Sequence, residues 1–219
     1  IMEHVRKGKS LTPDEEKLML EHHIPKWYIE SCKKIKYMFP KAHAIAYCIM
    51  AVRVAWFKVY HPEYYYACYF TLRCDAYEIE TMIKDVDSIY DRMMKLYKDI
   101  QDRDIKTSKK EQDIFDTLEV TYEMASRGYK MVNIDLNRSL AKEFIVNPDN
   151  NHEIIPPFVI LDGLGENVGE SIVKAREERP FISKEDLMNR TLLSTTLCKK
   201  LEDLKVLDEL QDSNQMSLF

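Results

Sequence analysis

The sequence predicts a mainly α-helical chain in which a larger helical domain precedes a small second domain with one short β-hairpin. Apolar residues recur three and four positions apart over most of the 219 residues, which is the period of helices with one buried face. Charged residues make up 32% of the chain, enough to cover the solvent-facing sides of many helices. Alternating, strand-like runs are confined to one stretch, on either side of a Pro-Asp-Asn-Asn turn at 148–151.

The first helices are marked by their boundaries. Thr12 before Pro13, followed by acidic residues, is typical of a helix start. A second helix is expected to start at Pro25 and to run on until it stops before Pro40. Two more are expected over 42–60 and 62–74, separated at His61-Pro62.

The expected helix over 42–60 is apolar on nearly all sides and is interrupted only by Arg53 and Lys58. A helix that is apolar all round is usually buried, so we expect it to be central in the fold. Because no run of about 18 apolar residues occurs, no membrane span and no membrane partner are expected.

Two amphipathic helices follow, over 77–103 and 109–127, and Gly128 ends the second as a C-cap glycine. We expect the domain boundary near residue 133. The strand-like runs 144–146 and 153–155 form the predicted hairpin. Further helices are expected in 158–161, 166–178 and the segments that follow. The organisation is then 1–132, 133–212 and a tail over 213–219.

Charge is divided unevenly along the chain. Residues 1–62 hold 11 Lys and Arg against 6 Asp and Glu, a net charge of +5, whereas residues 63–219 hold 21 against 31, a net charge of −10. A basic front on an acidic chain indicates a locally bound anionic ligand, and the alternative is a solvated basic face. The five cysteines form no C-x-x-C pair, which favours reduced thiols in the cytoplasm.

Three of the five glycines, Gly163, Gly165 and Gly169, fall in "LDGLGENVGES" between two expected helices. Glycine permits a tight turn and a close backbone approach, and the next helix directs free N–H groups at the same point. A phosphate fits there without sequence preference. This arrangement resembles the helix-hairpin-helix motif, with Gly163, Leu164 and Gly165 as the DNA-binding hairpin. The alternative is a turn that only lets two helices pack.

Positive charge for this hairpin is expected from Lys174, with Arg176 and Lys184. Several glutamates in the same helix oppose it, so duplex affinity should be modest and sensitive to salt. A second, degenerate copy is expected in "LSTTLCKKLEDL", where Ser194 and Thr195 take the hairpin positions. This copy lacks glycine, and we expect it to be largely structural.

The basic front contains a second candidate site. Pro40 breaks the preceding helix, so Lys41 and His43 lie at the start of the next one, where helix N–H groups, an ammonium and an imidazole can converge on a triphosphate. Tyr47 follows one turn later on the same face and can pack against a base or sugar. The alternative is an ordinary pair of partly buried residues at helical spacing.

The stretch "CKKIKYMFPKAHAIAYCIMAVRVAWFKVYHP" resembles the fingers of bacterial replicative DNA polymerases of the C family, most closely the PolC type of Gram-positive bacteria. Phe39 to His43, the Ala46-Tyr47 pair and His61-Pro62 fit the family pattern, and "IPPFVILDGLGENVGESIVKARE" follows in the same order. The resemblance covers the whole chain. It implies a fingers domain over 1–132 and a tandem helix-hairpin-helix domain over 133–212 that holds primer–template duplex.

The resemblance also implies roles for residues. Lys41, His43 and Tyr47 would meet the incoming dNTP, with Arg6 and Lys7 reaching its phosphates. The catalytic carboxylates and Mg²⁺ of this nucleotidyltransferase belong to the palm, outside this chain. We therefore expect no catalytic residue, metal site or bound cofactor here, and no polymerisation by this chain alone.

The ending "QMSLF" resembles the pentapeptide that binds the bacterial sliding clamp. Gln215 would hydrogen-bond at the rim of a groove that buries Leu218 and Phe219. Clamp, primer–template DNA, dNTP and other replisome subunits are thus the expected partners. Two alternatives stay open: a free-standing helix-hairpin-helix adaptor with a clamp-binding tail, and a purely structural all-α interaction domain.

Overall fold

The structure is a computed structural model that describes residues 1–102 and 104–213. The chain is mainly helical, as predicted, with one small three-stranded sheet. It divides into two compact units, Ile1–Ala55 and Trp56–Phe219. The predicted clamp-binding residues Gln215, Leu218 and Phe219 lie outside the described residues.

The first unit contains α1 (Met2–Arg6), α2 (Pro13–Glu21), α3 (Lys26–Lys34) and the start of α4 (Lys41–Tyr60). The predicted start of α2 is confirmed. The Thr12 hydroxyl accepts from the Glu15 N–H, and the Glu15 carboxylate accepts from the Thr12 N–H. The unit has its own small core of buried side chains, which are Val5, Leu11, Met19, Ile29 and Cys32.

Helix α3 ends at Lys34, so the expectation that it continues to Pro40 is wrong at this end. Ile35 is already extended, with φ −74° and ψ 119°. The chain instead crosses the end of α1: the Met38 N–H donates to the Arg6 carbonyl over 2.9 Å. A Cβ on Gly8 would lie 1.6 Å from the Lys36 carbonyl oxygen, and Gly8 has φ +71°. Glycine at position 8 therefore permits this crossing.

Helix α4 (Lys41–Tyr60) has the predicted extent, but the prediction that it is buried is wrong. None of its residues is buried among the described part of the chain. An apolar surface is covered only if other elements reach it, and α1 to α3 are packed around their own core. By length and composition, at mean hydropathy 1.3, α4 is the one helix of the described residues that could cross a membrane. The absence of a membrane partner stays a prediction.

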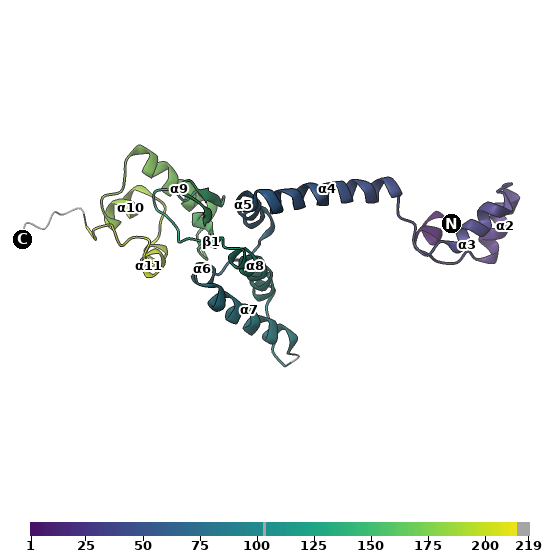
Figure 1. Ribbon diagram of the computed structural model, residues 1–219, viewed down its shortest axis with the longest axis horizontal. Coiled ribbons are helices and arrows are strands. Elements are labelled where there is room, and N and C mark those ends of the chain that lie inside the picture. The colour runs from purple at the N-terminus through teal and green to yellow at the C-terminus, as the bar shows by residue number, and fades with distance from the viewer. Residues whose placement is uncertain (103, 214–219) are drawn as a thin grey trace, which may run out of the picture. The chain divides into compact units, whose positions relative to one another are not determined.

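The second unit begins with the last turn of α4 and α5 (Pro62–Arg73), where His61-Pro62 separates the two helices as predicted. The single helix expected over 77–103 is two: α6 (Ile79–Met82) and α7 (Val86–Gln101), because the Asp85 carboxylate caps the Ser88 N–H and restarts the helix. Helix α8 (Lys109–Ser126) packs along α7, and Gly128 follows its C-cap Arg127 at φ +84°. Figure 1 shows this pair.

The predicted β-hairpin is present as β2 (Ile145–Asn147) and β3 (Asn150–Ile155), which pair antiparallel. The sheet has a third strand that sequence reasoning missed. Strand β1 (Lys130–Met131) runs parallel to β3 on its other edge, with Lys130 opposite Glu153. Two residues are too few to show a strand-like alternation.

The remaining elements are the 3₁₀ helix η1 (Phe158–Ile160), α9 (Glu166–Glu178), α10 (Lys184–Arg190) and α11 (Thr195–Asp203). One continuous core runs through the second unit from Tyr66 on α5 to Leu207. It crosses residue 133, where the sequence predicts a domain boundary, and that boundary stays a prediction.

Candidate nucleic-acid interface

The glycine stretch forms a helix, a tight hairpin and a second helix: η1 ends at Ile160, α9 begins at Glu166, and the turn lies between them. Gly163 has φ +89°, a conformation that favours glycine. The Leu164 side chain is buried, and its N–H donates to the Leu161 carbonyl over 2.9 Å. Leu164 thus anchors the hairpin from inside, and its two glycine neighbours form the outer surface of the turn.

The N-terminus of α9 is open. Gly165 is its N-cap, with φ −79° and ψ 162°, and no side chain caps the helix. The first N–H groups of a helix have no partner within it, and they favour an anion. The second hairpin differs, because the Ser194 hydroxyl accepts from the Leu197 N–H at the start of α11. The Ser194 side chain therefore caps α11, whereas no side chain caps α9 at Gly165.

Gly169 is buried in α9 and packs closely on the loop before β2. A Cβ at this position would come within 3.1 Å of the Ala141 backbone. The glycine therefore lets α9 approach the loop that holds it. Its neighbour there is a loop residue and not a second helix.

Two lysines converge on the first hairpin. Lys110 of α8 places its ammonium 2.8 Å from the Asp162 carboxylate, and Lys200 of α11 donates to the Asp162 carbonyl oxygen over 2.7 Å. The hydrogen bond from Lys110, with the charges of both lysines, holds the pKa of Asp162 below its usual value. A third lysine, Lys142, pairs with Glu166 in the first turn of α9. Sequence reasoning missed all three, because they are distant from the hairpin in the sequence.

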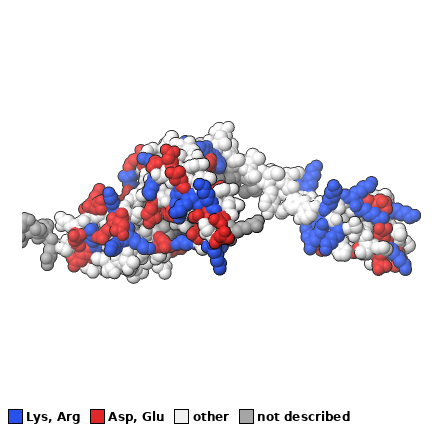
Figure 2. Space-filling view, turned by 90° about the horizontal axis from the view of Figure 1, so that it is seen from below, with Lys and Arg blue, Asp and Glu red and all other residues white. Residues whose placement is uncertain are grey.

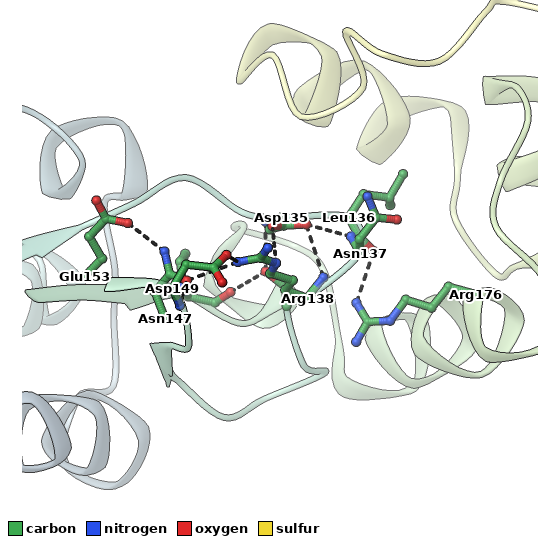
Figure 3. A network of polar contacts seen from close by, with 10 residues as sticks. Asp135, Leu136, Asn137, Arg138, Asn147, Asp149, Glu153 and Arg176 are labelled. Atoms are coloured by element: carbon green, nitrogen blue, oxygen red, sulfur yellow. Dashed lines mark hydrogen bonds and ion pairs between the residues drawn. The ribbon is translucent and has the colours of Figure 1, made fainter. Parts of the chain in front are cut away.

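The cations named from the sequence are placed differently. Lys174 is exposed on α9. Arg176 donates to the Leu136 carbonyl over 3.1 Å, and burial lowers the pKa of its guanidinium. Figure 3 shows this side chain directed from α9 to the 135–138 loop, beside the polar network of Asp135 and Arg138. Lys184 pairs with Asp212 and Glu202, and the hydrogen bonds that its ammonium donates to these two carboxylates raise its pKa. Arg176 and Lys184 therefore already have internal partners.

The connection between α9 and α10 is held by a buried carboxylate. Asp186 of α10 accepts two hydrogen bonds from Arg179, at 3.0 and 2.7 Å, and one from Arg190 at 3.2 Å. Burial acts to raise the pKa of Asp186, but the hydrogen bonds from Arg179, the Ile182 N–H and Arg190 outweigh it, so the pKa lies below its usual value. This ionised network fixes α10 against the end of α9.

The predicted nucleotide face lies at the start of α4 in the first unit. Lys41 is the first residue of the helix and is exposed. The rings of His43 and Tyr47 are 4.5 Å apart, so they share one face as predicted. Phe39 packs on His43 at 4.9 Å, and Tyr37 stacks on Phe39 at 6.3 Å. The structure therefore extends the predicted pair into a column of four rings.

Basic residues lie next to this column in the sequence, at Lys36 and Lys41. The Lys36, Lys41 and Arg6 side chains belong to the same unit, and Arg6 pairs with Glu3 over 2.8 Å. Figure 2 shows Lys and Arg side chains spread over the first unit on the face in view, while the α4 segment carries few charges. In the described part of the chain no three His, Cys, Asp or Glu side chains gather as a metal site.

Comparison with known proteins bears on the helix-hairpin-helix region and on the family of the chain. A family model described as a helix-hairpin-helix motif matches residues 128–216. The PolC-type DNA polymerases III of Staphylococcus aureus strains MW2, USA300 and NCTC 8325 are each 50% identical to the chain over all 219 residues. The chain spans 15% of the length of these relatives. The chain therefore belongs to the PolC-type DNA polymerase III family, of which it represents one segment that includes the helix-hairpin-helix region.

Proposed function

We propose that this chain is the part of a replicative DNA polymerase that holds the primer–template duplex, and that the hairpin at Gly163–Gly165 contacts its phosphates. One observation carries the proposal: within the matched helix-hairpin-helix region, the first hairpin leaves the N-terminus of α9 without a side-chain cap, whereas the second hairpin caps itself with Ser194. Backbone N–H groups bind phosphate without reading sequence, as a polymerase requires.

Duplex binding tests this proposal. The 219-residue chain is titrated onto a fluorescent 20-base-pair DNA at several salt concentrations, and anisotropy is recorded. We expect weak binding whose affinity falls steeply as salt rises, because Lys–phosphate contacts release counterions. Absence of binding at low salt, or binding insensitive to salt, would contradict the proposal and favour a structural interaction domain.

The exposure of α4 favours the interpretation that the chain is a segment of a larger enzyme over the interpretation that it is a free-standing adaptor. Large apolar side chains such as Ile49, Val52 and Trp56 are about half exposed or more along this helix. A soluble protein rarely exposes so continuous an apolar surface unless another surface covers it. The relatives hold 85% of their length outside the matched segment, which offers such a surface. We therefore assign DNA-directed DNA polymerase activity to the whole enzyme, inside the cell, with Mg²⁺ at carboxylates elsewhere in it.

At the start of α4, Lys41, His43 and Tyr47 are proposed to contact the incoming dNTP in the complete polymerase. The column of rings beside an exposed lysine supports this role, because aromatic faces stack on bases while an ammonium pairs with phosphate. In the complete enzyme, Lys41→Ala and His43→Ala should raise the KM for dNTP more than the Kd for DNA. Unchanged nucleotide kinetics in both variants would remove the assignment.

The tail residues Gln215, Leu218 and Phe219 are proposed to bind the sliding clamp. The support is their pattern in the sequence, a glutamine followed by two apolar residues at positions three and four. Such a peptide anchors by two side chains in a groove and one amide at its rim. Other replisome subunits are the remaining proposed partners.

A further inference from the structure

The contacts around Asp162 join three separate elements. Asp162 lies in the first hairpin. Lys110 belongs to α8 and is 52 positions from Asp162 in the sequence, and Lys200 belongs to α11 and is 38 positions from it. One ammonium lies on the carboxylate and the other on the carbonyl oxygen of the same residue. Two positive charges are thereby held at the outer edge of a turn whose backbone is proposed to bind phosphate.

We propose that Lys110 and Lys200 are phosphate ligands of this hairpin, and that the Asp162 carboxylate holds Lys110 in position until a DNA phosphate replaces it. The inference rests on the proposed duplex binding and adds the side chains that the sequence did not reveal. Asp162 then acts as an internal competitor that keeps the affinity for DNA low.

The exposure of the pair supports such an exchange. The Lys110 and Asp162 side chains are 56% and 71% exposed, so their contact is screened by water and is weak. A phosphate oxygen offers Lys110 the same kind of charged hydrogen-bond acceptor. Exchange of one acceptor for the other is therefore compatible with an intact fold.

Lys200 can bind the same DNA phosphate without first being released from a carboxylate. Its contact is with a neutral carbonyl oxygen, which does not cancel its charge. A Cβ added to Gly163 would lie 4.0 Å from the Lys200 ammonium, so this charge lies directly beside the glycine backbone. Lys200 and the open N-terminus of α9 thus both lie at this one turn.

The test uses four variants of the 219-residue chain on the 20-base-pair duplex. Asp162→Asn removes the charge but keeps the side-chain shape, and we expect a gain in affinity of up to about fivefold. Lys110→Gln and Lys200→Gln should each lose about fivefold and flatten the plot of log affinity against log salt by about one unit. In the double variant Asp162→Asn with Lys110→Gln, most of the gain should disappear.

Matched controls are available in the same unit. Asp149 is an exposed carboxylate paired with Arg138, and Lys95 is exposed on α7. Asp149→Asn and Lys95→Gln should each change the affinity less than Asp162→Asn and Lys110→Gln do. Thermal unfolding of every variant shows whether the fold is kept.

Two results would overturn the proposal: unchanged affinity in both lysine variants, or a gain from Asp162→Asn that persists in full when Lys110 is glutamine. The second would show that the carboxylate only repels DNA and does not restrain the lysine. Failure of the proposed function is a different result, in which the unaltered chain does not bind duplex at all. An unaltered chain that binds, with lysine variants that bind equally well, rejects this inference alone.

Discussion

The substitution Gly165→Ala separates what the fold needs from what DNA binding needs. Gly165 has φ −79° and ψ 162°, extended backbone that any residue adopts, and an added Cβ would meet nothing within 4 Å. Helix N-caps favour glycine over alanine, so we expect the free energy of unfolding to fall by about 0.5–1 kcal/mol at most. Nothing else in the structure requires glycine at this position.

The expected effect on DNA affinity is larger. A methyl group at Gly165 lies beside the N–H groups at the start of α9, where the phosphate is proposed to approach. Loss of one hydrogen bond to a charged group costs about 1.5–3 kcal/mol, which corresponds to a roughly tenfold to 150-fold higher Kd. The perturbation thus affects binding more strongly than it affects the stability of the chain.

Anisotropy on the 20-base-pair duplex measures the first quantity, and thermal unfolding the second. Gly128→Ala is the matched control, because Gly128 also faces open space but has φ +84°. That variant should lose about 1–2 kcal/mol of stability and keep its affinity for DNA. If Gly165→Ala binds duplex as well as the unaltered chain, no phosphate comes close to this turn and the reasoning is refuted.

Three further predictions concern other parts of the chain. Gly8→Ala should speed amide hydrogen exchange throughout residues 1–38, because its Cβ would collide with the Lys36 carbonyl; protection equal to that of the unaltered chain would contradict this. Asp186→Asn should cost about 2–3 kcal/mol. Because folding lowers the pKa of Asp186, its ionised carboxylate contributes to the free energy of unfolding above about pH 4, and this contribution is lost as pH falls through the pKa of the folded state. The free energy of unfolding of the variant, measured against pH, should therefore not show this loss. Truncation after Asn214 should abolish binding to a purified sliding clamp, and equal binding by both forms would leave the tail without this role.

Local signals in the sequence predicted some of the helix boundaries, although the local cap at Asp85 was missed. Thr12 with Glu15, and Gly128, act through contacts within a few residues, so a pattern of residue types is enough to reveal them. The early end of α3 was not predictable, because it depends on Lys36 crossing Gly8, which lies 28 positions earlier. The exposure of α4 was also missed, since periodicity describes the helix and not the elements around it.

The candidate site divides in the same way. Gly163 and Gly165 were found because a tight turn before a helix leaves a local signal. Lys110 and Lys200 carry no such signal, because the fold brings them to the hairpin from distant helices. Sequence reasoning chose Arg176 instead, a neighbour along the chain whose guanidinium the fold uses on the Leu136 carbonyl.

The net negative charge of residues 63–219 predicts that this part of the chain binds DNA weakly. Residues 63–219 carry a net charge of −10, and even the hairpin contains Asp162, so long-range electrostatics oppose the approach of DNA. In the proposed phosphate contact, the local N–H groups and two lysines must overcome this field, so we expect a contact that is easily broken and reads no sequence. Such a contact suits an enzyme that moves along its duplex. Under the proposed clamp attachment, the tail keeps the hairpin at a high effective concentration near DNA, so the weak contact suffices. Asp162→Asn is expected to raise the affinity of the hairpin for DNA and so to lengthen the residence time of the chain on DNA. This effect should be larger in a chain without its tail than in the complete chain, because no second attachment then holds the chain near DNA.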